Sequence, residues 1–131
     1  MALSSQLNSW APRVLSIVRI VAGLAFMVHG LGKHFGFPDL GMVFDPGSPP
    51  WIAGWIELVG GALIAVGLFT RLAAFISSGT MAVAYFMVHA PQSFYPAVNG
   101  GEAALLYCFL FFYLVFAGPG PWSVDAKMGR S

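Results

Sequence analysis

Charged side chains are scarce in this sequence. Only 8% of its 131 residues are Asp, Glu, Lys or Arg, whereas 58% are hydrophobic. A water-soluble domain carries about 25% charged residues, so the composition excludes an ordinary soluble protein. The net charge of +1 also excludes nucleic-acid binding, which needs a concentrated Lys/Arg surface to neutralise phosphates. The composition therefore predicts a membrane protein whose first partner is the lipid bilayer.

Cysteine is almost absent as well. Cys108 is the only one, which excludes a disulfide within the chain and a Cys-x-x-Cys dithiol.

The first twelve residues carry no basic side chain, and the apolar segment after Arg19 lacks the Ala-x-Ala cleavage pattern of a signal peptide. We therefore expect the first apolar segment to be retained.

What the sequence does contain is a series of long apolar segments. Four of them approach the roughly 20 residues that a membrane-spanning helix needs. They cover residues 14–32, 51–69, 72–89 and 102–117. Stretches rich in Pro and Gly separate them, and Thr70-Arg71 is the shortest joint, which predicts a helical hairpin. The expected fold class is all-α, a single antiparallel four-helix bundle in the membrane over residues 1–131.

The distribution of basic residues predicts the orientation of this bundle. With four spans, both chain ends and the Thr70-Arg71 joint share one side of the membrane. That side holds Arg13, Arg71, Lys127 and Arg130, whereas the other holds Lys33 beside Asp39, Asp45 and Glu102. Lys and Arg concentrate in cytoplasmic loops, so both termini are expected in the cytoplasm. Trp10 suits the aromatic belt at the cytoplasmic boundary.

Ionisable residues inside a membrane are costly, and they are functional candidates for that reason. Five of them converge on the outer half of the bundle, and we take them as the candidate binding pocket. They are His29, Lys33, Glu57, His89 and Glu102. Glu57 is the deepest, and it shares a helix face with Gly54, Gly60 and Gly61, a small-residue stripe that favours close helix packing. Glu57 is therefore predicted to point inward.

Three kinds of chemistry compete for this cluster. His29, Glu57 and His89 offer the hydrogen-bonding and proton-exchanging groups that a quinone pocket needs. The same three residues are ligand types for a metal ion, although no diagnostic ligand spacing is present. The paired histidines could also ligate a haem. The cofactor therefore stays open among quinone, metal and haem.

Structural explanations compete with the functional ones for several residues. Asn99 and Glu102 have the spacing of a capping box, in which both side chains satisfy free N–H groups at a helix start. Lys33 can extend its ammonium to the lipid headgroups. Arg19 can do the same at the inner side, or it can pair with Asp125 if the tail folds back. These alternatives leave Glu57 as the strongest functional candidate.

Five motifs in order along the chain resemble those of the DoxX family of small four-helix bacterial membrane proteins. They are His-Gly-Leu-Gly-Lys at residues 29–33, Gly-Trp-Ile-Glu-Leu-Val-Gly-Gly at 54–61, Gly-Leu-Phe-Thr-Arg at 67–71, Asn-Gly-Gly-Glu at 99–102, and Gly-Pro-Gly followed by Ser-Val-Asp within 118–125. The resemblance implies a bundle in the bacterial inner membrane. It also implies association with redox systems, because a related group of polypeptides forms a thiosulfate:quinone oxidoreductase and some mycobacterial members join an assembly with superoxide dismutase.

Residues and resemblance together favour one function and leave two alternatives. The favoured hypothesis is a membrane subunit of a redox or oxidative-stress system, a quinone-linked oxidoreductase subunit if it is enzymatic, working with protein partners. The first alternative is a non-catalytic scaffold or anchor that recruits partner proteins. The second is small-solute transport between the helices, for which homo-oligomers could supply the space that one compact bundle lacks.

Overall fold

The regular structure of this protein is helical throughout the part of the chain that the computed structural model describes, residues 2–131. The long helices are α1 (Ala2–Phe35), α2 (Pro49–Val66), α3 (Thr70–Ala84) and α5 (Glu102–Ala117). The short elements are the π-helical turn η1 (Tyr85–His89) and the helices α4 (Pro96–Asn99) and α6 (Val124–Lys127). The all-α fold class predicted from the sequence is confirmed.

Three helices are long and apolar enough to cross a membrane. They are α1, α2 and the continuous helix formed by α3 and η1 over Thr70–His89. Helix α5 is also apolar but has only 16 residues. Because so much apolar surface faces outward along these helices, they are suited to lipid contact, and the protein is a multi-pass membrane protein.

Two predicted helix boundaries are wrong. Helix α1 begins at residue 2, not near residue 14, because the polar first turns are helical and continue through Pro12. The joint between α2 and α3 is Gly67 to Phe69, with both of these residues at positive φ, whereas Thr70 and Arg71 begin α3. Hydropathy marks where a helix is apolar, and a helix can extend well beyond that segment.

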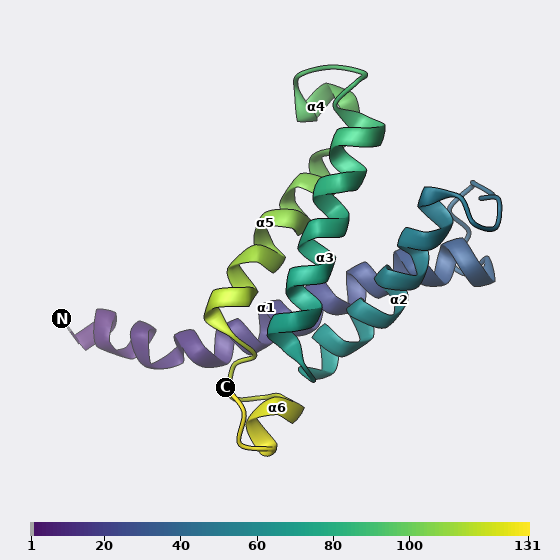
Figure 1. The fold of residues 1–131 in the computed structure, drawn as a ribbon. Coiled ribbons are helices and arrows are strands. Elements are labelled where there is room, and N and C mark those ends of the chain that lie inside the picture. Colours follow the sequence, from purple (N-terminus) through teal and green to yellow (C-terminus); the bar gives the residue numbers. More distant parts are fainter. Residues whose placement is uncertain (1) are drawn as a thin grey trace.

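The four long helices form two hairpins that diverge. Figure 1 shows α1 packed along α2, and α3 along α5, with the two pairs spreading apart from the α2–α3 joint. Phe26 of α1 ties the pairs together, because its ring lies 4.8 Å from Phe111 and 5.3 Å from Tyr107 on α5. The two hairpins therefore lie furthest apart on the side away from the joint.

Glycines bring α1 and α2 into backbone contact. A Cβ added to Gly61 would lie 2.6 Å from the backbone nitrogen of Met27, and one added to Gly23 would lie 2.5 Å from that of Ala65. Both distances are far below van der Waals contact. The small-residue stripe predicted on the second helix is therefore confirmed as a packing surface, and it sets how closely Glu57 of α2 approaches α1.

Arg19 joins the base of the hairpins to the chain's tail. Its side chain is 1% exposed and donates hydrogen bonds to backbone carbonyls at the end of α2 and in the tail. The acceptors are Ile64 (2.9 Å), Ala65 (3.4 Å), Trp122 (2.7 Å) and Pro119. Carbonyls in the last turn of a helix lack partners within it, so a guanidinium with five donors satisfies them well. The interpretations of Arg19 as snorkelling or paired with Asp125 are both wrong.

Asp125 instead caps the start of α3. Its carboxylate accepts hydrogen bonds from the backbone N–H groups of Phe69 and Thr70, each at 2.9 Å, and lies 3.6 Å from Arg130. The tail therefore folds back onto the α2–α3 joint. The interpretation that paired Arg19 with Asp125 had assumed such a fold. Burial raises the pKa of the Asp125 carboxyl, but the bonds from Thr70 and Phe69 and the charge of Arg130 outweigh it, so the pKa lies below its ordinary value.

Replacing Asp125 with asparagine should remove a pH-dependent part of the stability. A carboxyl whose pKa is lowered by folding stabilises the protein above its unfolded pKa of about 3.9, and this contribution is lost as the pH falls through the folded pKa. We expect Asp125→Asn to cost about 1–2 kcal/mol at pH 7, and the difference from wild type to shrink below about pH 4. Thermal melts in detergent between pH 7 and pH 3 measure both. Asp39→Asn is the control, because Asp39 is exposed and bonds only locally to Gly41.

Candidate functional site

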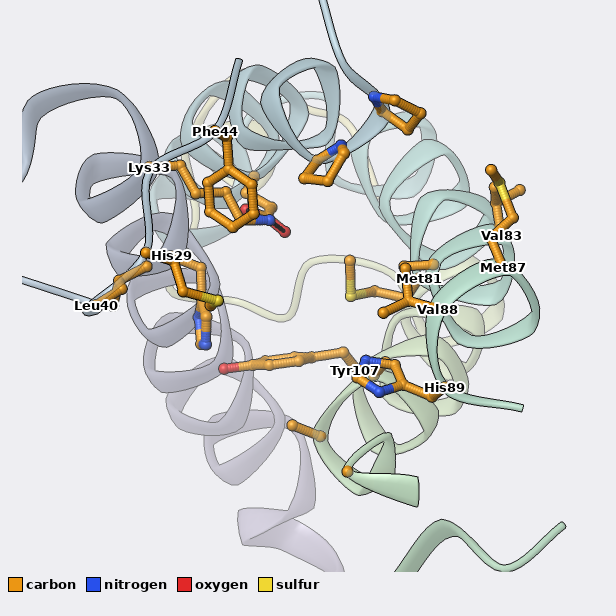
Figure 2. Close-up of a pocket in the computed structure, with 18 of the residues that line it drawn as sticks. His29, Lys33, Leu40, Phe44, Met81, Val83, Met87, Val88, His89 and Tyr107 are labelled. Atoms are coloured by element: carbon orange, nitrogen blue, oxygen red, sulfur yellow. Dashed lines mark hydrogen bonds and ion pairs between the residues drawn. The ribbon is translucent and has the colours of Figure 1, made fainter. Parts of the chain in front are cut away.

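A cavity of about 470 Å³ lies between the two hairpins, on the side where they diverge. Most of its wall is apolar, and α1, the loop before α2, α2, the end of α3, η1 and α5 all contribute to it. The principal apolar side chains are Phe26, Leu40, Met42, Phe44, Met81, Val83, Met87 and Val88. Figure 2 shows them around an open centre, with polar groups at opposite sides. A cavity of this size can hold a single aromatic ring with substituents.

Four of the five candidate residues line this cavity, namely His29, Lys33, Glu57 and His89. Glu102 does not, since it is exposed at the start of α5. The capping-box prediction is wrong too. The residue that caps α5 is Gly101 with no side-chain cap bond, and Asn99 accepts its hydrogen bond from Gly101 N–H at 2.7 Å.

Glu57 is buried and paired with Lys33. Its side chain is 5% exposed, and the Lys33 ammonium lies 3.0 Å from both carboxylate oxygens. Only the contact to Oε2 has hydrogen-bond geometry, so Oε1 is a buried oxygen without a hydrogen-bond partner within residues 2–131. The prediction that Glu57 points inward is confirmed, and the snorkelling alternative for Lys33 is wrong. An acceptor left open in a largely apolar cavity is a place where a ligand O–H or N–H gains a strong hydrogen bond.

The two cavity histidines bond to the backbone through the same ring nitrogen, Nδ1. His29 Nδ1 lies 3.0 Å from the carbonyl oxygen of Ala25, and His89 Nδ1 lies 3.1 Å from that of Asn99. A carbonyl can only accept, so Nδ1 carries the proton in both rings. Neutral His29 and His89 therefore keep Nε2 as an acceptor. Glu57 and the two histidines therefore supply hydrogen-bond acceptors at the cavity wall.

Tyr107 is a cavity residue that the sequence reasoning missed. Its ring packs edge-on to His29 with the centroids 6.0 Å apart, and Figure 2 shows its hydroxyl end near His29 and its other end near His89. Tyr107 thus spans the cavity between the two histidines. Its signal in the sequence was a hydroxyl-bearing side chain on a mostly apolar helix, on the same helix face as the buried Ala104 and Phe111.

The π-helical turn η1 shapes the opposite wall. Ala90 N–H donates to the carbonyl of Tyr85 at 2.8 Å, five residues back, which widens the helix by one residue at this point. Such turns are frequent at functional sites. Asn99 holds the turn in place, because its side chain donates to the Tyr85 hydroxyl at 3.1 Å. The turn brings His89 to the cavity wall.

The geometry gives the metal hypothesis no support. Nowhere within residues 2–131 do three His, Cys, Asp or Glu side chains gather closely enough to hold a metal ion. His29 and His89 come from different hairpins and lie at opposite ends of Tyr107 (Figure 2). His34 is outside the cavity wall, where it stacks on Trp55 at 4.0 Å. Haem ligation by the two cavity histidines stays a prediction.

Three bacterial proteins are similar in sequence to this chain. An "Uncharacterized protein" of Haemophilus influenzae is 44% identical over 94% of this chain and 96% of its own length. An "Uncharacterized membrane protein" of Mycobacterium tuberculosis is 26% identical over 95% of this chain and 86% of its own. The Bacillus subtilis protein named "Putative oxidoreductase CatD" is 32% identical over 50% of this chain and 52% of its own.

No solved structure matches the chain significantly. The sequence model of the DoxX family matches residues 14–90, which include α2, α3, η1 and all of α1 except its first turns. That range is more than half of the chain, and it carries His29, Lys33, Glu57 and His89. This protein belongs to the DoxX family.

Proposed function

We propose that this protein is a membrane subunit of a redox system that binds a quinone-type ring in the cavity between its hairpins. The chain would form one domain with four spans in a bacterial inner membrane, with both termini in the cytoplasm. The charge distribution supports this orientation, because five of the six Lys and Arg residues, all except Lys33, lie at the end where the tail docks. The name of the Bacillus relative supports a redox role.

The choice of a quinone-type ligand rests on one observation. Glu57 Oε1 is a buried acceptor without a hydrogen-bond partner in a 470 Å³ cavity whose walls are mostly apolar. A reduced quinone has the matching chemistry, because it combines a flat apolar ring with two O–H donors. One hydroxyl would donate to Glu57 Oε1, and the second would donate to a histidine Nε2. The ring itself would pack against the Met and Phe side chains of the wall.

The residues of the cavity also suit proton exchange with such a ring. Glu57 and His29 are bases within one cavity, and Lys33 balances the charge of the carboxylate at 3.0 Å. A ring that loses its electrons to a redox group on a partner protein releases its two protons, and these two side chains can receive them. The protein would therefore hold the ring and manage its protons, while a partner would take the electrons.

Replacing Glu57 with glutamine tests this function. The amide removes the charged acceptor at nearly unchanged volume, and a hydrogen bond to a charged group contributes about 1.5–3 kcal/mol. We expect Glu57→Gln to weaken binding of a short-tailed quinol by roughly 10- to 100-fold. Titration calorimetry on protein in lipid nanodiscs under reducing conditions measures the affinity.

The matched control is Glu102→Gln, which makes the same chemical change at an exposed carboxylate outside the cavity. It should leave the affinity within twofold of wild type. Absence of quinol and quinone binding to the wild-type protein would contradict the proposal.

The scaffold alternative makes the opposite prediction, since a partner enzyme would co-purify with the Glu57→Gln variant and keep its activity. Transport would need a path past the buried Phe26–Phe111 contact.

A further inference from the structure

Helix α1 is too long to lie wholly inside a membrane. Its 34 residues span about 51 Å, whereas the hydrocarbon core is about 30 Å thick. Trp10 and Arg13 suit the interface, so residues 14–35, which span about 33 Å, account for the crossing. The first turns project beyond it. Figure 1 shows this end of α1 continuing past the other long helices.

Exposed apolar residues form one continuous seam along α1. They are Leu3, Leu7, Trp10, Val14, Ile17, Val21, Leu24 and Val28. All of them are at least 36% exposed, and Leu3 and Leu7 exceed 60%. Their spacing alternates between four and three residues over the whole length. This alternation is the a/d pattern of a two-stranded coiled coil, in which the helices supercoil to bring a 3.5-residue repeat to one side.

The seam faces away from the rest of the chain. The residues by which α1 packs on its own protein, such as Ser16, Arg19 and Phe26, are buried on the opposite side of the helix. Near the amino end, Asn8 and Pro12 line a groove shared with the tail. Both lie outside the a/d positions. The seam therefore has no partner helix within residues 2–131, and the ring of Pro12 does not interrupt it.

Contact with lipid explains the exposure of only part of the apolar seam. From Val14 onward, exposed apolar residues face the hydrocarbon core as in any membrane helix. Residues 2–9 lie beyond that core, and there Leu3 and Leu7 would face water while the rest of the helix surface carries the polar residues Ser4, Ser5, Gln6, Asn8 and Ser9. A helical end of this length is marginal in water without a packing partner. An apolar stripe on such a segment is stabilised when another helix covers it.

We infer that the occupant is a second copy of this chain, packed along α1 in a parallel two-fold dimer. Insertion gives every copy the same orientation in the membrane, so two α1 seams meet parallel and in register. The membrane also holds the copies at high effective concentration, which favours a coiled coil too short to persist alone. The flanking e positions suit close approach, because they include Ser4, Ala11 and Ala25. Arg13, the only charged flank, lies over the ring of Trp10 at 4.6 Å.

Disulfide cross-linking in native membranes tests the inference. In a Cys108→Ala background, single Leu3→Cys and Leu7→Cys substitutions place a thiol in the seam, where symmetry-related residues approach within disulfide distance. Oxidation should convert most of each variant to a covalent dimer. Ser5→Cys is the matched control on the opposite face, and its yield should be at least tenfold lower. Equal yields at residues 5 and 7, or monomer only at residues 3 and 7, would show that no such dimer forms.

A second measurement does not depend on cysteine chemistry. Replacing Leu3 and Leu7 together with glutamate should shift the protein from dimer to monomer in nanodiscs extracted directly from membranes, as read by mass photometry. Ser5→Glu should leave it dimeric. A Leu7→Cys adduct whose mass is not twice that of the chain would assign the seam to another protein and overturn the inference. The quinol affinity is a separate property of each copy, so it should not change in these variants.

Discussion

Replacing Arg19 with methionine is expected to lower the free energy of unfolding by about 3–5 kcal/mol, a loss comparable to that from breaking a buried ion pair. Methionine fills much of the same volume but donates no hydrogen bond. The carbonyls of Ile64, Ala65, Pro119 and Trp122 all lose a donor. Each buried acceptor left without a partner costs about 1–3 kcal/mol. The tail around Trp122 should also loosen from α1, because it loses the Arg19 bonds to Pro119 and Trp122, whereas the bonds of Asp125 to the α2–α3 joint remain.

Thermal melting in detergent measures the loss of stability, and the fluorescence of Trp122 reports on the tail. Arg13→Met is the control, since Arg13 is exposed and makes only local contacts, a 3.5 Å hydrogen bond to Ser9 and a cation–π contact to the ring of Trp10. Its effect should stay within about 0.5 kcal/mol. Similar melting temperatures for the two variants would mean that the carbonyls bound by Arg19 find other partners.

Replacing Gly61 with alanine is expected to cost about 2–3 kcal/mol, although it adds only one methyl group. The new Cβ would lie 2.6 Å from the Met27 nitrogen and 2.8 Å from the Gly23 carbonyl oxygen. These are backbone atoms, which cannot rotate away as a side chain can. Helices α1 and α2 would have to separate. Because Lys33 is on α1 and Glu57 on α2, their 3.0 Å ion pair should lengthen, and quinol affinity should fall with stability.

Gly79→Ala provides the control for this prediction. Gly79 is a helical glycine on the exposed face of α3, and a Cβ there meets nothing within 4 Å. Alanine is the better helix former, so this variant should be up to about 1 kcal/mol more stable than wild type. Both free energies can be measured by unfolding in mixed micelles. A neutral Gly61→Ala would show that the α1–α2 contact can relax.

The sequence alone predicted that the candidate residues lie at one end of the bundle. A helix has a known rise per residue, so the positions of Glu57 and His29 along their helices placed both of them toward the same end. The same reasoning gave the inward direction of Glu57, because a buried carboxyl cannot face lipid and its glycine neighbours mark the packing side. Four of the five predicted pocket residues line the cavity for this reason.

Prediction from the sequence failed where the local pattern around a residue was compatible with more than one hydrogen-bond partner. Asn99 and Glu102 have capping-box spacing, yet Asn99 turns to Tyr85 and Gly101 while Glu102 is exposed. Arg19 could have reached headgroups or Asp125, and it binds backbone carbonyls instead. In each case, distant groups that no local pattern shows offered the better hydrogen bonds.

Composition and periodicity by themselves determined that the chain is helical and that it belongs in a membrane, because transfer of side chains into lipid depends on each segment alone. The tertiary structure decided that the helices form two diverging hairpins, that Tyr107 and the turn η1 complete the cavity, and that Glu57 Oε1 is buried without a hydrogen-bond partner. Those features depend on how the hairpins pack against each other, and packing is settled by contacts between residues far apart in the sequence.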